Sequence, residues 1–253
     1  MPKLTHGSCF SGIGGFDLAA RWAGIETLWQ IENNEYCWKV LDRHFPNSKK
    51  YKDIKEVNPN ELESVNIISG GFPCQPFSFA GKRRGKTDDR YVWPRMLEII
   101  QLVKPSYVLC ENVFGIINVA LDQTIADLEA AGYTCETFII PACALDAPHR
   151  RDRIWIIAYT GSQYIYSPEI EARVNFEKIR ETAKEWHSIR FIHRGVNQVE
   201  FFKADEPILC RNANGLPFEL DRLKALGNAI VPQIAYLFFT AIKELEDKKI
   251  MVK

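Results

Sequence analysis

Residues 69–78 form the stretch on which the fold assignment rests: Ser69-Gly70-Gly71-Phe72-Pro73-Cys74-Gln75-Pro76-Phe77-Ser78. It follows the apolar run Val65-Asn66-Ile67-Ile68, which predicts a buried strand. Cys74 then lies just past the carboxyl end of this strand, at the edge where open α/β sheets bind their ligands. Two prolines fix the backbone around Cys74 and present its thiol. Taken alone, the segment fits a proline-rich turn with a chance cysteine as well as it fits a catalytic loop.

Downstream, the next strand along the chain ends in a carboxylate. Residues 91–103 have helical periodicity, and residues 105–110 predict a strand that ends in Glu111-Asn112-Val113. Strands that alternate with helices imply right-handed parallel crossovers, so such strands end at the same edge of a sheet. If the strands before Cys74 and Glu111 are neighbours, the thiol and the carboxyl group emerge side by side. A carboxylate in this place also fits a cap or an ion-pair partner.

Upstream, a glycine-rich turn predicts a nucleotide-like cofactor. Residues 3–10 predict the first strand, and Phe10-Ser11-Gly12-Ile13-Gly14-Gly15-Phe16 leads from it into a helix that runs through Trp22. Such a turn lets the backbone approach a ligand closely and points helix-start N–H groups at it. The spacing departs from the full dinucleotide fingerprint, so a tight turn without a ligand also fits.

Two acidic residues follow at the ends of the next two strands. Residues 25–31 predict a strand that ends at Glu32, about 20 residues after the glycine turn, where an acid can accept hydrogen bonds from ribose hydroxyls. After a helix over 35–45, a short strand over 51–54 carries Asp53 at its end. Glu32 alone also fits a surface glutamate. Three successive strand ends that offer glycines, Glu32 and Asp53 favour one cofactor pocket.

The second half of the chain departs from this alternation. We expect a helix over 122–131 and strands over 133–141 and 154–159, with the basic segment His149-Arg150-Arg151-Asp152-Arg153 in the turn between the two strands. The arginines of this segment then lie near the expected ligand site at the carboxyl ends of the strands. A helix start at Ser167-Pro168-Glu169 opens an apolar stripe that extends to Trp186.

The alternation ends before the C-terminal part, which suggests three regions. The polar, irregular residues 188–217 are typical of a small recognition lobe, and Leu226-Gly227-Asn228-Ala229-Ile230-Val231-Pro232 leads into a helix over 233–246. We expect a catalytic and cofactor-binding domain over 1–159, a small target-recognition region over 160–217, and a C-terminal segment over 218–253 that returns to the catalytic domain.

The composition limits the classes of protein to which this chain can belong. The 253 residues are 46% hydrophobic and 25% charged, which is enough for one substantial core with a small second lobe. There is no apolar run of roughly 18 residues and no charged-then-apolar leader after Met1, so we expect a cytoplasmic protein with no membrane span. Seven cysteines without a Cys-x-x-Cys pair favour reduced thiols over a zinc site or a disulfide framework.

The distribution of charge along the chain is more informative than the net charge. The formal net charge is zero, which by itself points away from a nucleic-acid partner. The segments Lys82-Arg83-Arg84-Gly85-Lys86 and 149–153 nevertheless concentrate positive charge that can meet phosphates. Either segment alone also fits a solvated loop.

Together these stretches closely resemble the cytosine-C5 DNA methyltransferases, in the order that this family has them. The matches are Phe10-Ser11-Gly12-Ile13-Gly14-Gly15, Glu32, Asp53-Ile54, Gly71-Phe72-Pro73-Cys74-Gln75-Pro76-Phe77-Ser78, Glu111-Asn112-Val113, Arg151 with Arg153, and Gly227-Asn228-Ala229-Ile230-Val231-Pro232. They cover the chain except for about 160–217. The resemblance implies an α/β, Rossmann-like class I S-adenosylmethionine-dependent methyltransferase fold, with a mixed, mostly parallel sheet and a small target-recognition lobe.

Three features depart from the family pattern. His149 stands where the family commonly has Gln, and Ala142-Cys143 replaces the usual dipeptide that contains Asn. The lobe is short and has no clear Arg-Leu-Gln-Gly-Phe-Pro segment. These departures affect target contacts and leave the expected catalytic pair intact.

The resemblance implies covalent catalysis on a flipped cytosine. Cys74 would add to C6 and make C5 nucleophilic, while Glu111 would bind N3 and the exocyclic amine and supply a proton. Arg153 would hold O2 of the base, and Arg151 a phosphate or neighbouring group. Both charges would favour the Cys74 thiolate. A base inside a duplex cannot reach such a cleft, so it must be extruded.

Binding residues follow from the same matches. The residues expected to bind S-adenosylmethionine are Phe10, Gly12, Gly14, Gly15, Glu32, Asp53, Ile54, Pro73, Asn228 and Ile230. Those expected to contact DNA are Gln75, Ser78, Lys82, Arg83, Arg84, Arg90 and Asn112, several of them on a mobile loop that closes over the base. Trp93 fits either a pocket wall or the core. No metal site is expected.

Other functions fit the pattern less fully. The small lobe leaves open the same chemistry on RNA, as in the tRNA-methylating branch of the family. A non-catalytic nucleic-acid-binding relative would not need Cys74, Glu111 and the glycines together, and a dinucleotide-dependent oxidoreductase gives Cys74 no task. The expected partners are double-stranded DNA and a cognate restriction endonuclease, and we expect a monomer.

Overall fold

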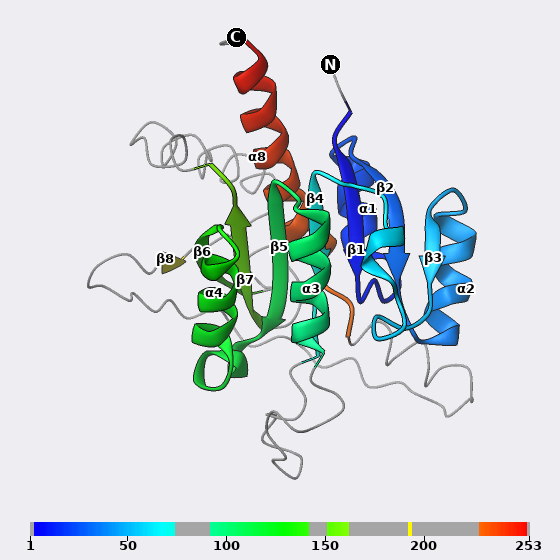
Figure 1. The fold of residues 1–253 in the computed structure, drawn as a ribbon, viewed down its shortest axis with the longest axis horizontal. Helices are drawn as coiled ribbons and strands as arrows, with labels where there is room; N and C mark the ends of the chain where they lie inside the picture. Colours follow the sequence, from blue (N-terminus) through cyan, green and yellow to red (C-terminus); the bar gives the residue numbers. More distant parts are fainter. Residues whose placement is uncertain (1–2, 74–91, 142–150, 162–191, 194–227, 252–253) are drawn as a thin grey trace, which may run out of the picture. The chain divides into compact units, whose positions relative to one another are not determined.

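The computed structural model describes residues 3–73, 92–141, 151–161, 192–193 and 228–251 (Figure 1). It divides into two compact units. The first comprises Met1–Cys110 with Leu209–Lys253, and the second comprises Glu111–Ile208. The chain passes from one unit to the other within a single strand, β5 (Tyr107–Val113).

The first unit contains a parallel sheet. Its strands are β1 (Thr5–Cys9), β2 (Glu26–Ile31), β3 (Lys49–Tyr51), β4 (Ile67–Gly70) and β5, in the order β3-β2-β1-β4-β5. Cys9 pairs with Ile31 on one side and with Gly70 on the other, and Gly70 pairs with Cys110. The carboxyl ends of β1, β2, β4 and β5 therefore share one edge. The expected adjacency of the fourth and fifth strands is confirmed.

The helices of the first unit are α1 (Gly15–Trp22), α2 (Glu35–His44), the short 3-10 helix η1 (Pro59–Glu61), α3 (Trp93–Val103) and α8 (Pro232–Met251). Helices α1, α2 and α3 begin and end close to the predicted residues, α8 continues past the predicted end at residue 246, and η1 was not predicted. Asn34 starts α2 because its side-chain oxygen accepts the Cys37 N–H at 3.1 Å. Lys104 ends α3 in a left-handed conformation with φ 52°.

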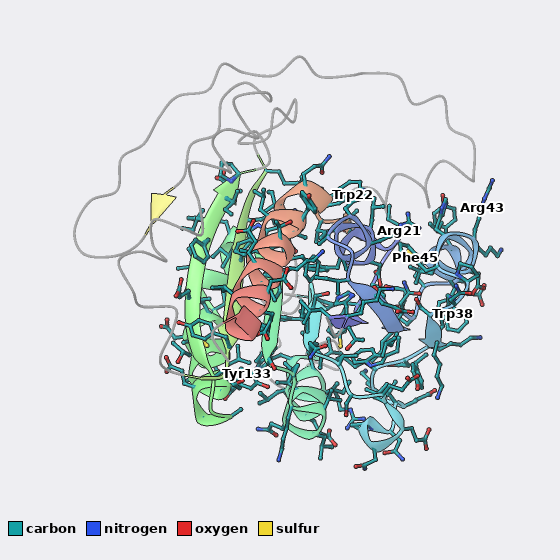
Figure 2. The ribbon with its side chains drawn as sticks, turned by 90° about the horizontal axis from the view of Figure 1, so that it is seen from above. Arg21, Trp22, Trp38, Arg43, Phe45 and Tyr133 are labelled. Carbon is teal, nitrogen blue, oxygen red and sulfur yellow. The ribbon has the colours of Figure 1, made fainter. Side chains whose placement is uncertain are left out.

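Helix α1 is fixed from both sides. On one side the guanidinium of Arg21 lies 4.9 Å from the centre of the Phe45 ring and donates to the His44 carbonyl, as Figure 2 shows for the two labelled side chains. On the other, Trp22 meets the Tyr236 ring of α8 edge-on. Lys243 of α8 donates to the Ala23 carbonyl at 3.1 Å. The C-terminal helix α8 therefore packs against the end of the first helix.

The core of the first unit also buries charged and polar groups. His6 is fully buried between Thr27 and Ser69, with its ring nitrogens 2.9 and 2.7 Å from their hydroxyl oxygens. Burial lowers the pKa of His6 to about 3. Asp17 is equally buried, accepts a hydrogen bond from Ser8 at 3.3 Å, and has its pKa raised by burial to about 6. His6 is therefore neutral in the folded protein at neutral pH, and Asp17 takes up its proton at a higher pH than an exposed aspartate does.

The second unit contains an antiparallel pair. Strands β6 (Thr134–Pro141) and β7 (Asp152–Tyr159) pair along their whole length, and β8 (Ile192–His193) adds to β6 in a region expected to be irregular. The strand order in this unit is β5-β7-β6-β8. The 3-10 helix η3 (Phe114–Asn118) and helix α4 (Leu121–Ala130) follow β5. Antiparallel β6 and β7 make the sheet mixed, as expected.

Three predicted boundaries were wrong. The third strand covers Lys49–Tyr51 and not 51–54, because Asp53 forms a turn in which its side chain accepts the Lys55 N–H at 2.9 Å. Strand β5 continues through Glu111, so this residue lies within the strand. Arg153 also lies in a strand instead of a turn, because Ile140 pairs with Arg153 and Pro141 with Asp152.

Some predictions lie outside the described residues. They concern Cys74, Gln75, Ser78, Lys82, Arg83, Arg84 and Arg90, the helix after Ser167, and most of the recognition lobe. Within the described part of the chain, no helix has the length and apolar character that crossing a membrane requires.

Candidate active site

The turn after β1 has a backbone that few residues adopt. Phe10, Gly12 and Gly14 have φ values of 54°, 54° and 86°, all in the left-handed region. Glycine takes this conformation without strain, but Phe10 does not, and such outliers cluster at ligand sites. The turn is held by hydrogen bonds from Ser11 N–H to the Ile31 carbonyl at 3.0 Å and from Gly14 N–H to the Ser11 carbonyl at 2.9 Å. Its conformation is therefore set before any ligand binds.

Glu32 is tied directly to this turn. One carboxylate oxygen accepts the Gly12 N–H at 2.7 Å, and the other accepts the Asn34 N–H at 2.8 Å. Each oxygen retains a further lone pair that can accept a hydroxyl group. A Cβ at Gly12 would meet no heavy atom within 4 Å, so the backbone there faces open space. The structure thus brings together the two features that the sequence analysis assigned to one pocket.

The loop after β3 carries the third predicted feature. Asp53 follows β3 by two residues, and Ile54 is buried behind it. Backbone pairing connects this loop to Glu32, because Glu32 N–H donates to the Tyr51 carbonyl at 3.0 Å. Trp38 was not singled out from the sequence, yet its indole N–H donates to the Glu32 carbonyl at 2.5 Å, and Lys52 lies 5.7 Å from its ring centre.

The C-terminal segment reaches the same turn. A Cβ at Gly15 would lie 2.6 Å from Ile230 Cγ1, so Ile230 packs directly on the glycine backbone. Asn228 and Pro73 are both exposed. Trp93 is buried and packs on Phe72 with a ring separation of 4.9 Å, which supports its core assignment over a pocket wall.

A second group of predicted residues meets in the other unit. Glu111 is 8% exposed, and the Arg153 Nε lies 2.8 Å from one of its carboxylate oxygens. Burial raises the pKa of Glu111 to about 7, even though the charges of Arg153 and Arg151 act to lower it. The pKa of Arg151 is itself lowered by burial and by neighbouring Arg153. A carboxyl group in this state can hold or release a proton near neutral pH.

Asn112, which was expected to contact DNA, follows Glu111 in β5. It is buried, and its side-chain oxygen accepts the Val113 N–H at 2.9 Å. Its visible role is thus to order the end of β5. Cys74 lies outside the described residues, so its proximity to Glu111 stays a prediction.

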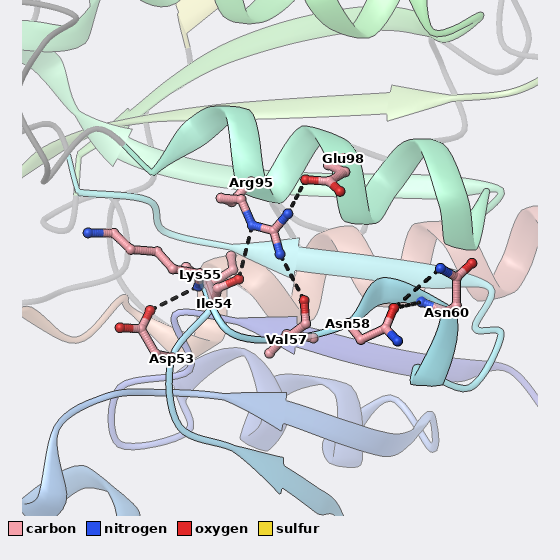
Figure 3. A network of polar contacts seen from close by, with 8 residues as sticks. All are labelled: Asp53, Ile54, Lys55, Val57, Asn58, Asn60, Arg95 and Glu98. Carbon is pink, nitrogen blue, oxygen red and sulfur yellow. Dashed lines mark hydrogen bonds and ion pairs between the residues drawn. The ribbon is translucent and has the colours of Figure 1, made fainter.

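Sequence reasoning missed Arg95 entirely. It lies in the first turn of α3 and donates to backbone carbonyls of the loop that follows Asp53 (Figure 3). An arginine near a helix start carries no sequence signal for this, because a solvated side chain would be equally compatible.

Comparison with known proteins bears on the family and the fold of this chain. Residues 4–201 match the family model described as C-5 cytosine-specific DNA methylase. The type II methyltransferase M.NgoFVII of Neisseria gonorrhoeae is 31% identical over 62% of this chain and 43% of its own length. M.HpaII of Haemophilus parainfluenzae is 30% identical over 90% of this chain and 66% of its own length. The chain thus spans less than two thirds of either relative.

The fold has a counterpart among solved structures. A mutant DNMT2 from Spodoptera frugiperda aligns with a TM-score of 0.56 and 24% identity, over 66% of this chain and 53% of that one. This likeness supports the class I methyltransferase fold. Because the family model matches well over half of its residues, the chain belongs to the family of C-5 cytosine-specific DNA methylases.

Proposed function

We propose that this chain transfers a methyl group from S-adenosylmethionine to C5 of a cytosine in duplex DNA. Family membership supports the reaction, and one observation carries it furthest. That observation is the buried Glu111 carboxyl group, which pairs with Arg153 and has a pKa near 7. A reaction on a pyrimidine ring changes the charge on the ring. A carboxyl group with a pKa near 7 can give or take a proton as this charge changes.

The residues of the first unit fit the cofactor. Glu32 and Asp53 are acceptors suited to the hydroxyl and amine donors of a nucleoside, and the open space at Gly12 admits it close to the backbone. When bound, S-adenosylmethionine supplies an electrophilic methyl group. Glu32 and the Gly12 turn would hold its nucleoside, while Ile230 would keep the turn in place.

Glu111 and Arg153 of the second unit, together with Cys74, would act on the base. Cys74, as a thiolate, would form a bond to C6 and push an electron pair toward C5. Glu111 would give a proton to N3, and Arg153 would stabilise O2 as negative charge spreads over the ring. After methylation, a water molecule takes the C5 proton and the N3 proton returns to Glu111. The C5–C6 double bond forms again, and the C6–sulfur bond breaks to release the Cys74 thiolate. Glu111 is buried within a β-strand of the protein. The cytosine would therefore have to swing out of the DNA duplex to reach it.

Biological context follows from the relatives' names. Both are called type II methyltransferases, which supports a place for this chain in a restriction-modification system with a cognate endonuclease. Double-stranded DNA would be the substrate in that setting.

Methyl transfer is tested with labelled S-adenosylmethionine and cytosine-containing duplex DNA. We expect label at C5, none with Cys74→Ala, and a loss of about 10²- to 10⁴-fold with Glu111→Gln. Cys135→Ser is the matched control, because Cys135 of β6 pairs with Ala158 of β7, whereas Arg153 pairs with Ile140, and this variant should keep full activity. A duplex with 5-fluorocytosine should become permanently attached to Cys74. Full activity in Cys74→Ala, or label only in tRNA, would contradict the proposal.

A further inference from the structure

The loop between β3 and η1 is held from two sides. From within, Asp53 accepts the Lys55 N–H on its side chain at 2.9 Å, and its carbonyl accepts the N–H groups of Glu56 and Val57 at 3.0 and 3.1 Å. These bonds close a compact turn that ends in a buried side chain, Val57. None of these three hydrogen bonds has the carbonyl of Ile54 or Val57 as its acceptor.

Arg95 supplies partners for those carbonyls from a different element. Its Nε donates to the Ile54 carbonyl at 3.3 Å, and its Nη2 donates to the Val57 carbonyl at 2.8 Å (Figure 3). The third corner of the guanidinium, Nη1, pairs with Glu98 one turn along α3. The planar group is therefore held in one orientation, with two of its three nitrogens on the loop.

This geometry exploits properties specific to arginine. The fork spans two carbonyls that are three residues apart, and hydrogen bonds from a charged donor are stronger than neutral ones. A lysine could reach only one of the two carbonyls with a single ammonium group. Ile54 and Val57 are both buried, so their carbonyls gain from a fixed partner instead of exchanging with water.

We propose that Arg95 is a positioning residue for the methyl donor. It fixes the loop of residues 53–57, and with it the Asp53 carboxylate, in the orientation that the cofactor pocket needs before the donor binds. This inference rests on the proposed function, since it concerns the same pocket. A preorganised loop lowers the ordering cost of binding, so Arg95 acts on affinity for the donor without touching it.

Titration calorimetry of S-adenosylmethionine into the DNA-free protein tests the proposal. Arg95→Met should raise the Kd about tenfold, which corresponds to about 1.4 kcal/mol. Arg95→Lys should give an intermediate Kd, because it keeps the charge and one possible carbonyl contact. Glu98→Gln is the matched control: it removes the ion pair but leaves both carbonyl contacts, and its Kd should stay within about twofold of the parent value.

Steady-state kinetics separate positioning from mere stabilisation. In Arg95→Met the KM for S-adenosylmethionine should rise while kcat at saturating donor and the KM for DNA stay unchanged. A purely structural role would lower the Tm and leave the Kd and KM of the folded protein as they were, and that result would overturn the inference. If Arg95→Met does not fold, the Kd and KM of Arg95→Lys for S-adenosylmethionine test the inference in its place. Failure of the parent protein to bind the donor would instead contradict the proposed function.

Discussion

At Glu111, two opposing effects set the charge of a single carboxyl group. Burial disfavours the ionised form, while Arg153 at 2.8 Å and Arg151 favour it. Burial prevails, and the pKa rises from its ordinary 4.5 to about 7. Between these values the folded state holds a proton that the unfolded state has lost, so the contribution of Glu111 to stability falls as the pH rises from 4.5 to 7.

We predict that the Glu111 carboxyl group titrates near pH 7 in the DNA-free protein. NMR of protein labelled with ¹³C at glutamate carboxyl carbons measures this directly, and Glu111→Gln identifies the signal. In Arg153→Gln the apparent pKa should move further upward, because an opposing charge has been removed. If turnover needs the protonated acid, kcat falls above the same pH. Titration near 4.5, or a downward shift in Arg153→Gln, would show that burial does not govern this group.

The sequence singled out Glu111, but the protonation state of its carboxyl group was not predictable from it. Its position after an apolar run, followed by Asn112 and Val113, indicated a site residue. The pKa depends on how deeply β5 is buried and on the distance to Arg153 in β7, which is 42 positions away in the sequence. No local pattern contains that information. The same holds for Arg95, whose partners Ile54 and Val57 lie far upstream.

Among the elements, the glycine turn and the C-terminal segment depend on each other. Ile230 occupies the space that a side chain at residue 15 would need, with 2.6 Å between a Cβ there and Cγ1. Beyond this contact, Tyr107 of β5 donates to Glu246 of α8 at 2.7 Å, and Lys243 holds the end of α1. The C-terminal helix is thus fixed at several points, so Ile230 has little freedom to move away.

We therefore predict that Gly15→Ala lowers the free energy of unfolding by about 1–3 kcal/mol through overpacking. Ile230→Ala should recover most of this loss in the double variant, because it removes the Cγ1 atom that the new Cβ would meet. Urea denaturation of the four proteins measures the coupling. Gly115→Ala is the control, since a Cβ there meets nothing within 4 Å, and it should change stability by less than about 0.5 kcal/mol. Additive effects of the two changes would contradict the contact.

Strands whose sequence has an apolar pattern were predictable, whereas β3, which lacks such a pattern, was placed wrongly. The runs that became β2, β4 and β5 alternate or cluster apolar residues, and all three were found from the sequence. β1 (Thr5–Cys9) has almost no apolar residue but is followed directly by the glycine-rich turn, and it was found as well. β3 consists of Lys49, Lys50 and Tyr51 at the end of the strand order, so it has no apolar pattern of its own and was placed too late. Its place is set by hydrogen bonds to β2.

For the whole molecule, the two compact units contain different groups of the predicted site residues. The first contains the glycine turn, Glu32, Asp53 and Ile230, and the second contains Glu111 with both arginines. The predicted boundary at residue 159 followed the end of the strand pattern, whereas the compact units separate within β5. Sequence periodicity cannot locate such a division, because a strand keeps its pattern while it crosses from one unit to the next.

Stability against acid brings two buried groups of the first unit into opposition. His6 has a pKa of about 3 instead of 6.5, so the unfolded state binds one more proton below pH 6.5, and stability is lost as the pH falls. Asp17 has a pKa of about 6 instead of 3.8, so the folded state binds one more proton between these values, and stability is gained as the pH falls. Each slope is about 1.4 kcal/mol per pH unit, and between pH 6 and 4 they cancel.

We predict that single substitutions expose this cancellation. Relative to the parent protein, Asp17→Asn should lose about 3 kcal/mol of unfolding free energy between pH 6 and pH 4, because only the His6 penalty remains. His6→Gln should gain about the same amount over the same interval, because only the Asp17 benefit remains. Urea denaturation at several pH values measures both slopes, and the difference from the parent removes contributions of all other groups. A variant whose slope equals that of the parent would show that the replaced side chain has no shifted pKa in the fold, and burial would then not decide its protonation.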